Sequence, residues 1–226
     1  MSFFVSTLSL LLFLSLTFAA CGRSTVDSSV ATPPSLARDP VNQVYALAWS
    51  PNGTDLATGG KNGLIQVWNT KSKTRLVTVK QHFGEVHALA WSPAGTRLAS
   101  GGQDFTVHLW NPTTGQQVAV YRSTFSTGEV LAVAWSPDGK YLASGSNDGI
   151  VQVWETATRT LVLAYSNFSG EDEVTTLAWS PDGKLLASTS TDRTVHIWDI
   201  STGAPRLVYR GHHDEVRSVA WSPNGR

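Results

Sequence analysis

A histidine, a serine and an aspartate close together in one stretch are the residues of this chain best suited to chemistry. His82, Ser100 and Asp104 follow one another closely, and Trp110 comes next. In a hydrolytic triad the histidine takes the serine proton while the aspartate orients the histidine. The same residue types also form buried hydrogen-bonded chains, because buried polar groups need partners. The sequence contains no Gly-x-Ser-x-Gly turn, phosphate-binding loop or spaced Cys/His zinc set that would favour an enzyme.

These residues belong to a unit that recurs along the chain. An Ala-Trp-Ser-Pro segment followed by a turn occurs five times, with its tryptophans at Trp49, Trp91, Trp135, Trp179 and Trp221. Successive tryptophans are 42, 44, 44 and 42 residues apart. A fixed period of about 40 to 45 residues is a signature of a repeat architecture.

The polar set is copied incompletely from unit to unit. The third and fourth units keep the serine, aspartate and tryptophan but not the histidine, whereas the first keeps only the tryptophan. The equivalent residues are Ser126, Ser144, Asp148 and Trp154, then Gly170, Ser188, Asp192 and Trp198, and in the first unit Thr58, Asn62 and Trp68. A catalytic set would not be partly copied into every repeat, whereas a structural set would. We therefore predict a structural role and no enzyme activity, with catalysis at the mouth of a central channel as the rival hypothesis.

Each unit has the pattern of a small sheet. In the second unit, apolar stretches bounded by Pro, Gly and Asn turns predict four strands, at residues 85–91, 97–101, 105–110 and 117–122. Four antiparallel strands with two apolar faces are marginal alone, so the copies must stack. Radial stacking gives a β-propeller. We predict an all-β fold, with four complete four-stranded blades plus the first strand of a fifth, in an incomplete ring over residues 41–226.

The units resemble WD-repeats, which are named for a Trp-Asp pair. The pair is intact at Trp198-Asp199 and altered elsewhere, and the Gly-His pair of that family is present at Gly211-His212 and altered at Gln81-His82. The resemblance implies that His82, Ser100, Asp104 and Trp110 form a structural tetrad. In it, Asp104 accepts a hydrogen bond from His82, and Ser100 links His82 to the Trp110 indole. It also implies protein partners that dock on the loops leading into the first strand of each blade.

The position just before the first-strand valine is acidic in four units. It holds Glu85, Glu129, Glu173 and Glu215, with Gln43 in the first unit. Like charges around a concave mouth reinforce one another, which favours a cationic peptide or a metal ion as ligand. The alternative is that solvent-facing hairpin ends simply carry charge. The position after the valine varies instead and is where partner specificity could lie: Tyr45, His87, Leu131, Thr175 and Arg217.

Other histidines suggest less. His212-His213-Asp214-Glu215 resembles a metal cluster, but neighbouring side chains on a strand point apart, so we expect no metal there and no cofactor. His108 and His196 each stand two residues before a tryptophan, which predicts packing between blades. The formal net charge is zero and charged residues are 15%, against about 25% in ordinary domains, so no nucleic-acid partner is expected.

The N-terminus has the composition of a targeting segment. Residues 3–20 are uncharged and rich in Leu and Phe, and they end at Ala19-Ala20-Cys21, which predicts a secretory signal over residues 1–20. The single cysteine excludes an intrachain disulfide, and its place resembles the lipidation site of bacterial lipoproteins. An uncleaved membrane anchor and a misassigned start are the alternatives. Residues 21–40, rich in Ser, Thr, Ala and Pro, read as a tether, so we expect an extracytoplasmic, membrane-associated bacterial protein.

The chain stops at Arg226, after the expected first strand of a fifth unit. We expect a fragment of a longer gene, two copies that complete a ring, or an open short arc; open blade faces favour self-association. The predicted function is a non-enzymatic platform for binding other proteins or peptides. The alternative is the N-terminal part of a longer or enzymatic propeller protein whose activity lies beyond residue 226.

Overall fold

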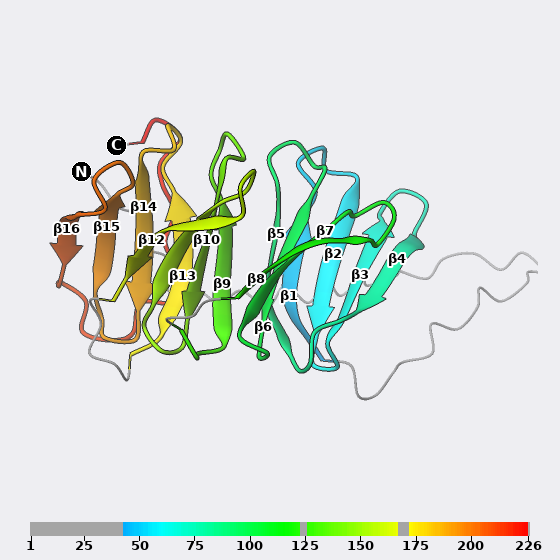
Figure 1. Ribbon diagram of the computed structural model, residues 1–226, viewed down its shortest axis with the longest axis horizontal. Coiled ribbons are helices and arrows are strands. Elements are labelled where there is room, and N and C mark those ends of the chain that lie inside the picture. Colours follow the sequence, from blue (N-terminus) through cyan, green and yellow to red (C-terminus); the bar gives the residue numbers. More distant parts are fainter. Residues whose placement is uncertain (1–42, 123–125, 167–171, 226) are drawn as a thin grey trace, which may run out of the picture.

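The chain folds into four small β-sheets. A computed structural model describes residues 43–122, 126–166 and 172–225. Within these residues there are sixteen strands and no helix, grouped into four separate sheets of four antiparallel strands. Figure 1 shows the sheets side by side, from β1–β4 in blue and cyan to β13–β16 in yellow and orange. The predicted all-β architecture with four four-stranded blades is confirmed.

Each blade is a meander in which strands adjacent in sequence are adjacent in the sheet. Blade 1 contains β1 (Val44–Trp49), β2 (Asp55–Gly60), β3 (Leu64–Asn69) and β4 (Thr74–Lys80). Blade 2 contains β5 (Val86–Trp91), β6 (Leu98–Gly102), β7 (Thr106–Trp110) and β8 (Gln117–Arg122). Blade 3 contains β9 (Val130–Trp135), β10 (Tyr141–Ser146), β11 (Val151–Glu155) and β12 (Thr160–Tyr165). Blade 4 contains β13 (Val174–Trp179), β14 (Leu185–Ser190), β15 (Val195–Asp199) and β16 (Pro205–Tyr209).

The Ser-Pro-x-Gly segment forms the turn between the first and second strands. In blade 2 the Gly95 amide donates to the Ser92 carbonyl at 2.8 Å, and Gly95 has a φ of 69°, which glycine adopts without strain. The Ser92 hydroxyl accepts from the Arg97 amide at 3.0 Å. The serine and glycine of the repeated segment are therefore both explained by the turn.

A hydrogen bond from a tryptophan indole joins each pair of neighbouring blades. The indole N–H of Trp91 donates to the Ala48 carbonyl of the preceding blade at 3.0 Å. Trp135 donates in the same way to the Ala90 carbonyl at 3.1 Å, and Trp179 donates to the Ala134 carbonyl at 3.0 Å. The first tryptophan of each unit is therefore a connection to the preceding unit as well as an apolar side chain.

Small residues on the second strands let the blades approach closely. A Cβ added to Gly59 would lie 2.6 Å from Cγ1 of Val86 in the next blade, and Gly145 is equally close to Val174. Both valines are fully buried. Apolar clusters accordingly span neighbouring blades, as where Ile65 and Val67 of blade 1 share a core with Trp110 of blade 2.

The prediction of a fifth first strand is wrong as secondary structure. Residues 216–221 pack as the other first strands do, because Val216 is buried and the Trp221 indole donates to the Ala178 carbonyl at 2.9 Å. They are nevertheless not a strand, since a first strand pairs with the second strand of its own blade, and no such partner follows within the described residues.

Several predictions concern residues outside the described part of the chain. These are the signal segment at 1–20, the tether at 21–40 with Cys21, and Gly170. Within residues 43–122, 126–166 and 172–225, no helix has the length and apolarity needed to cross a membrane.

Candidate functional site

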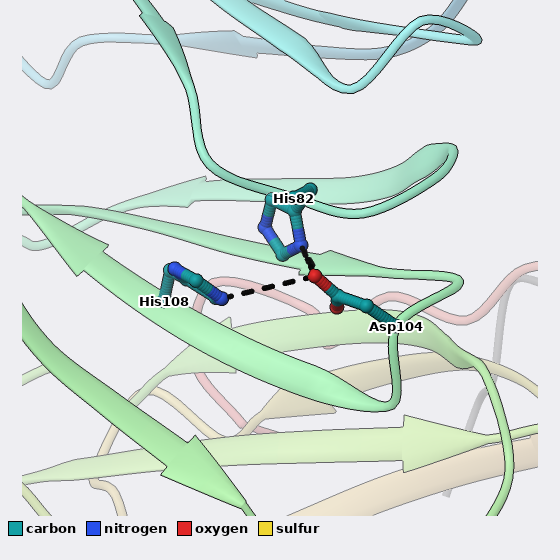
Figure 2. Close-up of side chains that lie close together, drawn as sticks. All are labelled: His82, Asp104 and His108. Carbon is teal, nitrogen blue, oxygen red and sulfur yellow. Dashed lines mark hydrogen bonds and ion pairs between the residues drawn. The ribbon is translucent and has the colours of Figure 1, made fainter.

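Blade 2 contains a buried hydrogen-bonded chain that runs from the turn before β7 to the side chain that ends β7. The His82 Nδ1 nitrogen lies 3.0 Å from both carboxylate oxygens of Asp104 (Figure 2). The His82 Nε2 nitrogen lies 2.7 Å from the Ser100 hydroxyl. Ser100 in turn accepts from the Trp110 indole at 2.8 Å. His82, Ser100 and Trp110 are all buried. The four tetrad residues are thus brought together with the hydrogen bonds that the resemblance implied.

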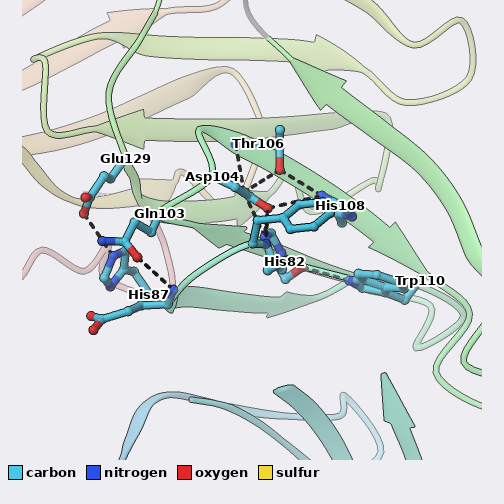
Figure 3. Close-up of polar contacts among 11 residues, drawn as sticks. His82, His87, Gln103, Asp104, Thr106, His108, Trp110 and Glu129 are labelled. Atoms are coloured by element: carbon cyan, nitrogen blue, oxygen red, sulfur yellow. Dashed lines mark hydrogen bonds and ion pairs between the residues drawn. The ribbon is translucent and has the colours of Figure 1, made fainter. Parts of the chain in front are cut away.

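Two further side chains extend this chain, and the sequence did not point to their role. The Thr106 hydroxyl donates to Asp104 at 2.6 Å and lies 2.8 Å from Nε2 of His108 (Figure 3). The His108 ring stacks on Trp110 of its own strand, with centroids 5.2 Å apart. This ring contact of His108 lies within its own blade, while Trp110 shares an apolar cluster with Ile65 and Val67 of blade 1. The predicted packing of His108 between blades stays a prediction. The spacing of two that places His108 and Trp110 on one face of β7 was the available signal.

Burial and hydrogen bonding set the charges of this cluster. Burial alone would raise the pKa of Asp104, but hydrogen bonds from His82 and Thr106 outweigh it and hold that pKa well below its usual range. Burial, with the nearby His82, lowers the pKa of His108 to about 4. The cluster at neutral pH therefore contains an ionised Asp104 beside a neutral His108.

Among the described residues, the corresponding hydrogen-bonded chain is shorter in blades 3 and 4. In blade 4 the Trp198 indole donates to Ser188 at 2.8 Å, and in blade 3 the Trp154 indole reaches Ser144 only at 3.4 Å. Ser126 occupies the histidine position of blade 3 and donates to Asp148 at 2.9 Å. The arrangement in blade 2 binds loop to strand and exposes no reactive serine, since Ser100 is fully buried.

The predicted partner-binding face begins where each first strand starts. The carbonyls of Glu85, Glu129 and Glu173 accept backbone hydrogen bonds at 2.8, 3.0 and 3.1 Å from the turn that follows the second strand. Their amides are held by Gln103, Asn147 and Thr191 side chains. The three glutamates therefore occupy equivalent backbone positions in three successive blades. We call these three residues, with Glu215, the acidic rim.

The side chains of the acidic rim make unequal contacts. Glu85 lies 4.0 Å from the Lys61 ammonium, and Glu129 lies 3.1 Å from Nε2 of His87 in the preceding blade (Figure 3). Glu215 pairs with Arg217 at 2.6 Å. Glu173 is exposed and has no ion pair within 4 Å among the described residues. The rim is therefore partly neutralised by basic neighbours.

A shallow groove of about 260 Å³ lies between the four first strands. Its lining includes the variable second residues Tyr45, His87, Leu131 and Thr175. The Tyr45 and His87 rings lie 6.1 Å apart, and the Tyr45 hydroxyl donates to Gln43 at 3.0 Å. Arg217, the variable residue of the fifth unit, is exposed. Residues that differ between blades are thus collected along one groove beside the acidic rim.

The chain repeats a four-stranded meander, and the first strands of neighbouring blades lie against one another. Together with the tetrad of His82, Ser100, Asp104 and Trp110, this arrangement defines a WD-repeat β-propeller protein. The chain belongs to the family of the second β-propeller of echinoderm microtubule-associated protein, whose profile matches residues 44–223. It is also similar to the mouse periodic tryptophan protein 2 homolog, with 46% identity over 41 residues. That match covers 18% of this chain and 4% of the mouse protein.

Proposed function

We propose that this chain is a non-enzymatic platform that binds other proteins through the acidic rim and the groove beside it. The observation that carries the proposal is the equivalent placement of Glu85, Glu129 and Glu173 at the starts of successive first strands. A β-propeller of the WD-repeat class is compatible with such a role. The partner we infer is a peptide segment rich in lysine or arginine, because its charge complements the rim.

The arrangement favours an extended segment rather than a small molecule. The groove is shallow and about 260 Å³, whereas ligand pockets are usually larger and more enclosed. Exposed Glu173 offers a carboxylate without an ion pair among the described residues, while exchange of Lys61 for a cation of the partner would free Glu85. Tyr45, 43% exposed at one end of the groove, supplies an aromatic surface for a bound side chain.

For the rest of the chain, we propose that residues 1–40 hold the platform outside the cytoplasmic membrane through Cys21. Support comes from the apolar segment before it and the polar tether after it. A Cys21→Ser chain that stays in the membrane fraction without incorporating labelled fatty acid would argue for an uncleaved anchor. The second candidate is that an activity lies beyond residue 226 of a longer protein.

A peptide array tests the binding proposal. The full chain is applied to peptides of graded lysine and arginine content, and the affinities of the best binders are then measured at several salt concentrations. Glu173→Lys should weaken these affinities about tenfold, or about 1.4 kcal/mol. The matched control is Glu155→Lys, which changes a carboxylate paired with Lys140 at the opposite end of its sheet.

The outcomes separate the two explanations of the rim. Loss of affinity in the Glu173 variant alone, with binding weakened by salt, supports a cation-binding face. Equal affinities for the Glu173 variant, the Glu155 variant and the unchanged chain would show that the rim is ordinary surface charge. Preference for acidic or uncharged peptides would also overturn the proposal.

A further inference from the structure

The polar cluster of blade 2 has a second capacity that its structural role does not require. His82, Asp104 and His108 present three ligand atoms that all lie within 4.8 Å of one another. Figure 2 shows the two imidazoles facing the same carboxylate, one from the loop before β5 and one from β7. Within the described residues, this is the one group of three or more histidine, cysteine or acidic side chains with such spacing.

We propose that His82, Asp104 and His108 bind a divalent transition-metal ion of the zinc type. Two imidazoles and a carboxylate, with a fourth position left open, are a ligand set that zinc sites use. His82 Nδ1 and Asp104 are 3.0 Å apart, and His108 Nε2 and Asp104 are 3.9 Å apart. Ligand atoms around a tetrahedral zinc ion are about 3.3 Å apart. Small side-chain rotations therefore suffice to bring the three atoms to the metal.

The surroundings leave the metal position accessible. A cleft of about 490 Å³ is lined by all three ligands and by Phe83, and His82 and His108 are only 4% and 6% exposed. The ligands are thus shielded, while an ion can enter through the cleft. Lys80 and Arg122 also line it, which would favour an anion such as hydroxide or a carboxylate as the fourth ligand.

The hydrogen-bonding surroundings of the two imidazoles suit the proposal. Coordination through His82 Nδ1 requires the ring proton on Nε2, where the Ser100 hydroxyl oxygen lies 2.7 Å away and can accept it. Coordination by His108 Nε2 places the other ring proton on Nδ1, which is buried without a hydrogen-bond partner. Gln117 lines the same cleft and provides an acceptor for that proton.

The other blades explain why the site is confined to blade 2. At the position of His108, β3 and β11 carry Gln66 and Gln152, while β15 carries His196. Blade 4 thus retains an aspartate and this histidine but has Gly170 in place of the first histidine. A structural tetrad alone needs no histidine at the His108 position. The second histidine is what converts a tetrad into a ligand set.

Metal titration of the full chain tests the proposal. Zinc binding is measured by calorimetry after chelator treatment and dialysis, and Co²⁺ absorption reports whether the site has four ligands. His108→Gln introduces the residue found in β3 and β11, so the tetrad should stay intact. His196→Gln is the matched control, because it makes the same change in a blade without the first histidine.

We expect one zinc ion per chain, at least tenfold weaker binding in His108→Gln, and unchanged binding in His196→Gln. The proposal is overturned if the unchanged chain binds no zinc at this stoichiometry, or if both variants bind equally. A zinc titration of ¹⁵N-histidine-labelled chain needs no variant. It should shift the ring signals of His82 and His108, and unmoved signals would refute the site even if zinc binds elsewhere.

Discussion

Ser100, Ser144 and Ser188 are buried at equivalent positions of three second strands, so they allow the tetrad to be measured one hydrogen bond at a time. The Ser100 hydroxyl makes two side-chain hydrogen bonds. One joins it to His82 Nε2 at 2.7 Å, and it accepts the other from the Trp110 indole at 2.8 Å. Ser188 accepts one, from Trp198 at 2.8 Å among the described residues. Within the part of the chain that the structure describes, Ser144 has one side-chain bond, from the Trp154 indole at 3.4 Å. Their exposed fractions are 0%, 0% and 4%, so the three sites differ mainly in bonding.

Serine-to-alanine substitution removes the same oxygen at each position. A buried polar group left without a partner costs about 1–3 kcal/mol. Ser100→Ala orphans both His82 and Trp110, so we expect a loss of about 2–5 kcal/mol in the free energy of unfolding. Ser188→Ala orphans one indole and should cost about 1–3 kcal/mol, while Ser144→Ala should cost about 0.5–1 kcal/mol because its bond is long. The largest value is a sizeable part of a typical domain stability of about 5–15 kcal/mol.

Urea unfolding followed by far-UV circular dichroism gives these differences as shifts of the midpoint. Repeat arrays do not always unfold in one step, so the m-value must stay constant across the variants for the comparison to hold. Hydrogen exchange of the Trp110 and Trp198 indole protons supplies a local measure. Equal costs for Ser100→Ala and Ser188→Ala would refute the reasoning, because the His82 bond would then contribute nothing.

Three further outcomes follow from the contacts. The pKa of His108 is about 4 in the folded chain, against an ordinary value of 6.5. The neutral form of His108 is therefore fully compatible with folding above about pH 6.5, and the free energy of unfolding falls as the pH drops from 6.5 toward 4, because only the unfolded chain then binds the proton. The free energy of unfolding, measured by urea titration across this range, should fall by at most about 1.4 kcal/mol per pH unit, and less steeply in His108→Gln. Gly59→Ala places a Cβ 2.6 Å from Val86 and should cost about 1–3 kcal/mol, with the double variant Gly59→Ala/Val86→Ala less destabilised than the sum. Trp135→Phe removes the 3.1 Å bond to the Ala90 carbonyl and should lower the free energy of unfolding by at least about 1 kcal/mol, whereas an unchanged urea midpoint would show that this bond does not contribute to stability.

The strands within a blade could be predicted from the sequence because their signals are local. In blade 2 the second strand was expected at residues 97–101 and lies at Leu98–Gly102, and the fourth was expected and found at Gln117–Arg122. Pro and Gly set the turns, and apolar runs set the strands. The misassigned first strand at residues 216–221 shows the limit, since strand identity depends on a partner that local composition does not supply.

Contacts between blades could not be predicted, although the residues that make them stood out. The period gives the distance between copies along the chain but not how one sheet is offset against the next. Trp91 was recognised as part of a motif, yet its bond to Ala48 depends on that offset. The same holds for the pairing of Glu129 with His87, which leaves one glutamate of the acidic rim with a basic partner.

The two sets of bonds in the repeat are copied with different fidelity, and this difference has a physical reason. The indole-to-carbonyl bond between blades recurs at 2.9–3.1 Å in all four described junctions. The full tetrad occurs in blade 2, and the other blades retain parts of it. In a stacked array, stability is the sum of each unit's own stability and its interfaces, so a weak tetrad can be offset by neighbours. An interface has no such substitute, because its loss separates two apolar faces. Blade 2 therefore has the fullest set of these bonds among the described blades, and its His82 and Asp104 lie beside His108, where we propose a second role.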